Sequence, residues 1–238
     1  MATKSSADLT CWKGGGNRCH CPQRVYVVIQ WGCALLVYFE GADGSGKDTQ
    51  ADALQLYWER NLNGFPLRLN EPDDTMPVGK LLRQLLASGS YDKTHAALFL
   101  ADRLAVQYTR VLPAVNVGSN VVCSRSFLST LVYQQEQWPL QWLFDIHRVL
   151  PVKPDFVFIL DVDPTVGLDR IDRRGLKREY YESTDFQTKN RQRYLDLAVD
   201  PRMGAMLAPD GKIIVLDGSR PACEIHADVV CAITEKRG

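Results

Sequence analysis

A glycine-rich stretch, Val37 to Gln50 (VYFEGADGSGKDTQ), carries residue types that could bind a phosphate. Gly41, Gly46 and Lys47 have the spacing of a phosphate-binding loop, in which backbone N–H groups converge on an anion and the lysine reaches the terminal phosphates. That pattern asks for a serine or threonine after the lysine, but Asp48 stands there. The spacing therefore predicts a phosphate site that contains an unexpected carboxylate.

The segments on either side of the loop predict the strand and helix that position it. Residues 34–40 (ALLVYFE) form an apolar run typical of a buried strand. Residues 47–61 carry apolar side chains on one stripe, which is typical of a helix. A glycine turn beside a solvated lysine is the structural alternative, but the strand–loop–helix context favours the phosphate site.

Along the rest of the chain, short apolar runs alternate with helical segments, the pattern of a parallel sheet covered by helices. We expect strands at 65–70, 120–124, 155–162 and 212–217, and helices at 78–86, 95–112, 126–137, 138–150, from 164, at about 181–198 and from 221. The prediction is an α/β fold of the P-loop NTPase class, with a parallel five-stranded sheet flanked by helices, in one domain at 34–238.

Residues 1–33 are predicted to be an N-terminal extension, disordered in part. The apolar run Val25 to Phe39 follows basic residues, as in a signal peptide or membrane anchor. It is shorter than the ~18 residues of a spanning helix, and Gln30 interrupts it. Its last residues are also needed as the strand before the loop, so we expect no membrane segment.

Charge and cysteine content narrow the class of protein. The formal net charge is +0, which argues against a broad electrostatic surface for nucleic acid. The seven cysteines are an odd number and several lie in apolar runs, which favours reduced thiols and a cytoplasmic location. Cys19, His20 and Cys21, with Cys11 upstream, do not match the spacing of a standard zinc module.

Five segments, in order, resemble the thymidylate kinase family of nucleoside monophosphate kinases, over about Val37 to the C-terminus. They are FEGADGSGKDTQ (39–50), NEPDDTMPVGKLLRQLL (70–86), ALFLADR (97–103), CSRSFLSTLVYQ (123–134) and KPDFVFILDVDPTVGLDRIDRRG (153–175). The resemblance implies transfer of the terminal phosphoryl group of ATP to dTMP, giving dTDP for dTTP biosynthesis. It also implies Mg²⁺ as cofactor and a homodimer.

The resemblance assigns the ATP phosphates to the loop, and the catalytic roles to Lys47, Arg125 and a mobile lid arginine. The loop residues are Gly41, Ala42, Asp43, Gly44, Ser45, Gly46, Lys47, Asp48 and Thr49. None of them is the arginine that some members carry there, so we expect it in a lid at about 173–183. Arg173, Arg174, Lys177 and Arg178 lie in the lid, and Arg178 is the best match. Charge runs are usually solvated faces, but a cation over the transferring group is the main catalytic demand.

The positions that match the family's dTMP-binding residues are Asp43, Phe99, Arg103, Arg125, Thr130, Tyr133 and Gln134. In the family, the loop aspartate accepts a hydrogen bond from the sugar 3′-hydroxyl. Phe99 and Arg103 are four residues apart on a helix and share a face, where they would stack on thymine and donate to its carbonyl. Arg125 would hold the phosphate, for which a guanidinium is suited. The ring of Tyr133 would leave no room for a 2′-hydroxyl.

Three departures from the family pattern fall on the predicted site. In the first, Asn70 stands where bacterial relatives have an arginine, and Asp73 and Asp74 replace a glycine pair. In the second, Ser124 replaces an aspartate. In the third, Asp48 replaces the loop hydroxyl. Extra carboxylates beside phosphates weaken binding unless a cation lies between them. We hypothesise a reciprocal exchange, in which Asp48 and Ser124 together supply the carboxylate and hydroxyl that hold a hydrated Mg²⁺.

Two alternatives stay open at the level of sequence. The departures could change the acceptor to another nucleoside or deoxynucleoside monophosphate. The chain could also be a catalytically inactive nucleotide-binding module, since fold does not fix function. Retention of Lys47, Arg125, Phe99 and Arg103 favours an active kinase, because these residues have little packing value.

Overall fold

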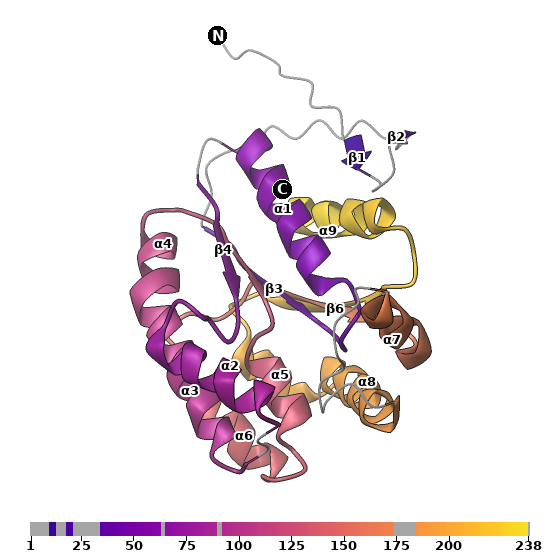
Figure 1. The fold of residues 1–238 in the computed structure, drawn as a ribbon. Helices are drawn as coiled ribbons and strands as arrows, with labels where there is room; N and C mark the ends of the chain where they lie inside the picture. Colours follow the sequence, from indigo (N-terminus) through magenta and orange to yellow (C-terminus); the bar gives the residue numbers. More distant parts are fainter. Residues whose placement is uncertain are drawn as a thin grey trace.

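The computed structural model describes residues 10–12, 18–20, 34–62, 65–89, 92–173 and 184–237. Its centre is the predicted sheet of five parallel strands, ordered β4-β5-β3-β6-β7 (Figure 1). The strands are β3 (Leu36–Glu40), β4 (Leu67–Asn70), β5 (Val121–Ser124), β6 (Phe156–Asp161) and β7 (Lys212–Asp217). A separate antiparallel pair, β1 (Thr10–Trp12) with β2 (Arg18–His20), lies within the predicted extension.

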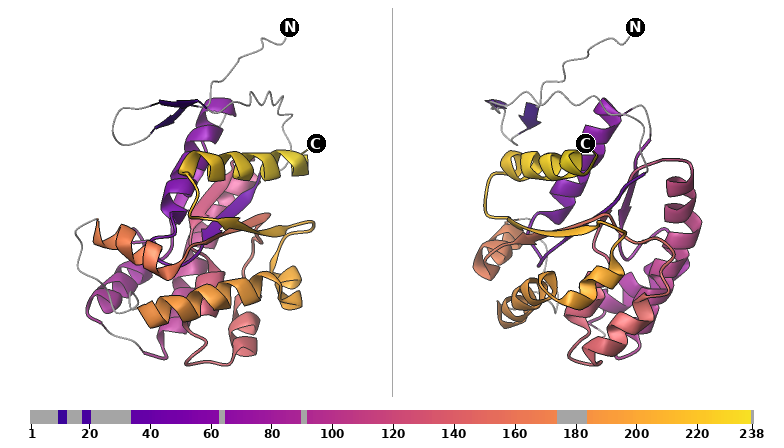
Figure 2. Two further views of the ribbon diagram at one scale, coloured as in Figure 1. Left: turned by 90° about the vertical axis from the view of Figure 1, so that its right-hand side faces the viewer. Right: turned by 180° about the vertical axis from the view of Figure 1, so that it is seen from behind.

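Helices cover both faces of the sheet, α1 and α9 on one side and α3, α5, α6 and α8 on the other (Figures 1 and 2). The α-helices are α1 (Lys47–Asn61), α2 (Pro77–Ala87), α3 (His95–Val106), α4 (Leu112–Asn116), α5 (Phe127–Tyr133), α6 (Leu140–His147), α7 (Pro164–Asp172), α8 (Thr184–Ala198) and α9 (Ala222–Arg237). Across the described helices, none has the length and apolar composition that a membrane crossing needs.

The two faces follow from the alternation of side chains along each strand. Val37 and Phe39 of β3 pack into the cluster formed with α1 and α9, while Leu36 and Tyr38 pack into the larger cluster on the opposite face. All four are at most 1% exposed. Because successive residues of a strand point to opposite faces, a strand buried on both sides is apolar throughout, as these residues are.

The helix predicted at 95–112 is longer than expected and has a change of pitch. It runs from α3 through a π-helical segment, Gln107–Val111, into α4. Pro113 lies just after the π segment and has no N–H, and its ring would clash with a carbonyl four residues earlier in a regular helix. The wider π-helical turn explains why the helix continues past Pro113 instead of ending there. The helix predicted at 126–137 instead ends at Tyr133.

Strand register brings three loops to one edge of the sheet. Ser124, the last residue of β5, pairs with Phe39 of β3 on one side and with Asn70 of β4 on the other. The residues that follow each strand therefore emerge side by side at the carboxyl edge. Ligands of open α/β sheets bind at this edge.

Candidate active site

The glycine-rich loop turns from β3 into α1 and packs against the backbone of α7. Gly44 has φ +78°, and a Cβ atom there would lie 2.1 Å from the carbonyl oxygen of Gly167. Glycine is therefore required both by the backbone angle and by the close approach. Gly46 precedes α1, and within the described residues no side chain caps this helix. The first N–H groups of α1 remain available to an anion.

Asp43 lies between the two cations of the loop edge. Lys47 Nζ is 3.3 Å from Asp43 Oδ1 and 3.3 Å from the carbonyl oxygen of Ala42. Arg125 forms an ion pair with the same Asp43 oxygen. Burial alone would raise the pKa of Asp43, but the charges of Arg125 and Lys47 outweigh it and lower that pKa to about 2. Asp43 is therefore an ionised acceptor at neutral pH.

Arg125 has a backbone conformation that is unusual for its residue type. Its φ is +70°, directly after β5, and its N–H donates to the carbonyl of Phe39 at 2.9 Å. The guanidinium lies over the ring of Tyr133, 5.5 Å from the ring centroid, and reaches Ser129 Oγ at 3.5 Å. A left-handed non-glycine residue costs about 1–3 kcal/mol and is typical of functional sites.

A pocket opens beside Asp43 and Arg125. It is lined by Asp43, Phe99, Arg103, Arg125, Thr130, Tyr133 and Gln134, which are all seven residues predicted to bind the acceptor. Sequence reasoning missed five further lining residues, Glu71, Pro72, Arg83, Leu86 and Ser129. The buried Oε1 atom of Gln134 has no hydrogen-bond partner in the described part of the chain, so it remains available to a donor from a ligand.

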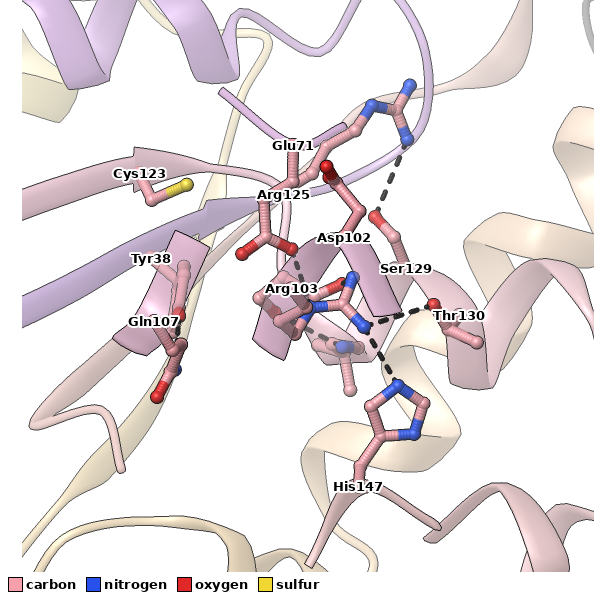
Figure 3. A network of polar contacts seen from close by, with 12 residues as sticks. Tyr38, Glu71, Asp102, Arg103, Gln107, Cys123, Arg125, Ser129, Thr130 and His147 are labelled. Atoms are coloured by element: carbon pink, nitrogen blue, oxygen red, sulfur yellow. Dashed lines mark hydrogen bonds and ion pairs between the residues drawn. The ribbon is translucent and has the colours of Figure 1, made fainter. Parts of the chain in front are cut away.

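Besides lining the pocket, the buried Arg103 side chain is held by several other groups of the protein (Figure 3). Its side chain is 2% exposed, and Nε lies 2.5 Å from Glu71 Oε2. The guanidinium also contacts Thr130, His147 and the carbonyl of Ser126. Glu71 directly follows β4 at the carboxyl edge, and that place in the fold was the signal that could have identified it.

Asp48 does not stand alone in the first turn of α1. Burial would raise its pKa, but the Ser124 hydroxyl and the charges of Lys47, Arg125 and Arg68 lower it below the ordinary value. Ser124 Oγ is buried and lies beside this carboxylate, although no hydrogen bond of ordinary geometry engages it within the described residues. Arg68 Nη2 is 3.6 Å from Asp48 Oδ1. The Asp48 carboxylate and the unengaged Ser124 hydroxyl therefore lie together, and Arg68 offsets part of the negative charge of Asp48.

The departure at Asp73 is not an extra charge in the pocket, and that part of the sequence interpretation is wrong. The Asp73 carboxylate is 5% exposed, pairs with Arg110 at 2.7 Å and accepts from Thr75. It closes the turn before α2 instead of lining the pocket. Asp74 is exposed. Asn70 accepts a hydrogen bond from Arg68 at 2.7 Å.

Helix α8 reaches the loop through Gln187, which sequence reasoning missed. Gln187 Oε1 accepts from the backbone N–H of Asp43 at 3.2 Å, and its Nε2 lies 3.4 Å from the Asp43 carboxylate. Of the predicted lid cations, Arg173 is 77% exposed and pairs with Asp169. The other three, Arg174, Lys177 and Arg178, lie outside the described residues.

Comparison with known proteins identifies this arrangement. The family profile described as thymidylate kinase matches residues 39–229. The chain belongs to the thymidylate kinase family. Its sequence is 33% identical over 214 residues to a probable thymidylate kinase of Thermococcus gammatolerans, covering 85% of this chain and 97% of that protein. It is 35% identical over 208 residues to thymidylate kinase of Dinoroseobacter shibae, covering 84% and 96%.

The fold comparison agrees. The solved structure of thymidylate kinase from Candida albicans superimposes with a TM-score of 0.69 at 23% identity, covering 86% of this chain and 93% of that one. The predicted fold class is thereby confirmed. Membership of the family makes the chain a nucleoside monophosphate kinase, with dTMP to dTDP as its reaction.

Proposed function

We propose that the protein carries out this reaction with ATP as donor and with the sequence-predicted residues in their roles. The loop from Gly41 to Thr49 holds the ATP phosphates, and Lys47 neutralises the terminal ones. The observation that supports this best is the pocket, in which all seven acceptor residues meet directly beside Lys47. Phosphoryl transfer asks mainly for positioning and charge stabilisation, which such an arrangement supplies.

On the acceptor side, we assign the dTMP phosphate to Arg125 and the sugar 3′-hydroxyl to Asp43. An ionised Asp43 accepts a hydrogen bond and repels a 3′-phosphate. In this structure, Asp43 is itself the anion that Arg125 binds. A phosphate that binds Arg125 would compete with Asp43 for this guanidinium, and a carboxylate oxygen would then be free for the hydroxyl. Phe99, Arg103, Thr130, Tyr133 and Gln134 complete the base and sugar contacts.

For Mg²⁺, the side chains beside the loop fit the ion. Mg²⁺ keeps several waters and takes one or two carboxylates with substrate phosphates, so it needs no cage of protein ligands. In keeping with this, no cluster of three metal-binding side chains occurs in the described residues. Asp48 and the unengaged Ser124 hydroxyl would hold the hydrated ion. When bound, Mg²⁺ neutralises charge on the phosphates.

Four further parts of the proposal rest on the sequence. Arg178 remains our candidate for the lid arginine. Residues 1–33 remain our candidate for an extension that precedes the kinase domain at 34–238. A homodimer is implied by the family. A cytoplasmic location fits the free thiols of Cys123, Cys223 and Cys231 in the described residues.

An assay of ADP release over a panel of nucleoside monophosphates tests the proposal. We expect selective turnover of dTMP, and loss of about 10²–10³ in kcat for Lys47→Ala, the scale of removing one transition-state donor. A different preferred acceptor would support the alternative of another monophosphate kinase. Intact ATP binding with no turnover of any acceptor would support the inactive module.

A further inference from the structure

Arg103 has a fixed number of hydrogen-bond donors, and the protein itself uses most of them. A guanidinium carries five N–H groups: one on Nε and two on each Nη. Nε donates to Glu71 at 2.5 Å, and Nη2 donates to the carbonyl of Ser126 at 2.9 Å. Nη1 faces His147 Nε2 at 2.8 Å and Thr130 Oγ1 at 3.4 Å (Figure 3). Among the described residues, one N–H on Nη2 is left without a partner.

His147 has a defined tautomer, because each ring nitrogen faces a group that can act in one way only. Nδ1 lies 2.7 Å from the carbonyl oxygen of Leu143, which can only accept, so Nδ1 carries the proton. Nε2 faces Arg103, which can only donate, so Nε2 is the acceptor. His147 is 0% exposed, and burial together with the Arg103 charge lowers its pKa to about 3. The ring therefore stays neutral.

His147 does not line the acceptor pocket, so it has no contact with a substrate there. It approaches Arg103 from α6, behind the guanidinium, and its ring packs near Phe127 with centroids 6.3 Å apart. A histidine at this position is a neutral acceptor that engages an arginine without cancelling its charge. Glu71 already pairs with Arg103, so His147 adds an acceptor without adding a second negative charge, and an apolar side chain in its place would leave Nη1 without this acceptor and the guanidinium less firmly held.

We propose that His147 is a positioning residue that holds Arg103 so that a single N–H is offered to the base of the acceptor. This inference rests on the proposed function, in which Arg103 donates to a carbonyl of the base. One donor from a fixed direction suits a carbonyl oxygen, as in thymine. It opposes the amino group that cytosine carries at the corresponding position, because two donors then face each other. His147 thus acts on base selection from outside the pocket.

The test compares His147→Leu with His147→Gln, whose amide can accept from Arg103 and donate to Leu143. Binding of dTMP and dCMP is measured by calorimetry, and kcat and KM for both by steady-state kinetics. We expect His147→Leu to weaken dTMP about tenfold, the scale of one hydrogen bond to a charged group, and to narrow the preference for dTMP over dCMP. The kcat with saturating dTMP and the KM for ATP should stay within about twofold. His147→Gln should restore most of the preference.

Phe127→Leu is the matched control, since it loosens the packing around the His147 ring but removes no polar contact of Arg103. It should lower the melting temperature without changing base preference. An equal loss of preference in Phe127→Leu, or an unchanged preference in a folded His147→Leu, would overturn the proposal.

A measurement on the unaltered protein covers the case in which His147→Leu does not fold. ¹⁵N NMR of histidine-labelled protein at neutral pH should show His147 protonated at Nδ1 and bare at Nε2. Protonation at Nε2 instead would refute the proposal. Absence of dTMP turnover by the wild type would count against the proposed function alone, provided that binding still prefers dTMP over dCMP. Wild-type binding that does not distinguish the two would overturn the present inference.

Discussion

The Arg68 guanidinium lies 3.6 Å from the Asp48 carboxylate and 2.8 Å from the carboxylate of Asp52, one turn further along α1. One cation from β4 thus faces two carboxylates on the helix that begins at the phosphate loop. The Arg68 side chain is 13% exposed, whereas that of Asp48 is 59% exposed. The carboxylate that replaces the loop hydroxyl therefore has a counter-charge on a neighbouring strand, which offsets part of its repulsion toward a triphosphate.

Replacing Arg68 should expose that repulsion. In Arg68→Met we expect the KM for ATP to rise about two- to fivefold at low salt, since partly exposed ion pairs are worth about 0.5–1 kcal/mol. The effect should shrink at high salt, because exposed charges are screened. Steady-state kinetics at saturating dTMP measures it. Arg60→Met, at the far end of α1, is the control; an equal rise there, or none in Arg68→Met, would contradict the prediction.

The exchange hypothesis for Asp48 and Ser124 has a different test. Asp48→Ser alone should lower turnover and raise the Mg²⁺ concentration needed for half-maximal rate, because it removes the only carboxylate of the pair. Adding Ser124→Asp should restore part of both. The double-mutant cycle measures the coupling, and strictly additive losses would show that the two side chains do not act together.

Arg125 should be intolerant even of lysine. Lysine tolerates a φ of +70° as well as arginine does, so Arg125→Lys should fold, but it loses the planar fork that suits a phosphate. We expect the KM for dTMP to rise about 10- to 100-fold, from the scale of one charge-assisted hydrogen bond. Kinetics at saturating ATP checks this, with thermal unfolding as the control for folding. A change confined to the KM for ATP would contradict the assignment of Arg125 to the phosphate of dTMP.

The buried His147 should make the protein sensitive to acid. Its pKa is about 3 in the folded state, owing to burial and to the charge of Arg103, against an ordinary value of 6.5. Between these values the unfolded chain binds a proton that the folded chain does not, so stability is full above about pH 6.5 and falls as the pH drops toward 3. By pH 5.5 the loss from this residue is about 1 kcal/mol.

Urea unfolding of the wild type and of His147→Gln at pH 7.5 and 5.5 measures this loss. Burial raises the pKa of Glu71, the partner of Arg103, to about 7, and because Glu71 is present in both proteins its titration contributes equally to each. The wild type should lose about 1 kcal/mol more than the variant over this range. A difference between the two proteins that is the same at both pH values would contradict the neutral, buried histidine.

The sequence predicted what is encoded locally. The strand–loop–helix unit around Lys47 could be located because its glycines, apolar run and helix follow one another directly, and α1 spans the predicted residues. The seven acceptor residues could be named because they lie in short motifs. That they line one pocket follows from the strand order, since β4, β5 and β3 are neighbours.

Contacts between distant segments could not be read in the same way. Arg103 was expected at a pocket wall, yet its partners come from three separate segments, which no local pattern connects. Asp73 looked like an added charge at the site until Arg110, from the π segment, was seen to neutralise it. Gln187 carries no motif of its own and gains its role only because α8 packs beside the loop.

The contact between Gly44 and Gly167 restricts where this kinase can keep a mobile arginine. No side chain fits at position 44, because the carbonyl of Gly167 would lie 2.1 Å from its Cβ atom. An engineered variant with an arginine at position 44 would first have to displace the backbone of α7 at Gly167. A substitution at position 44 therefore requires a matching shift of the backbone of α7.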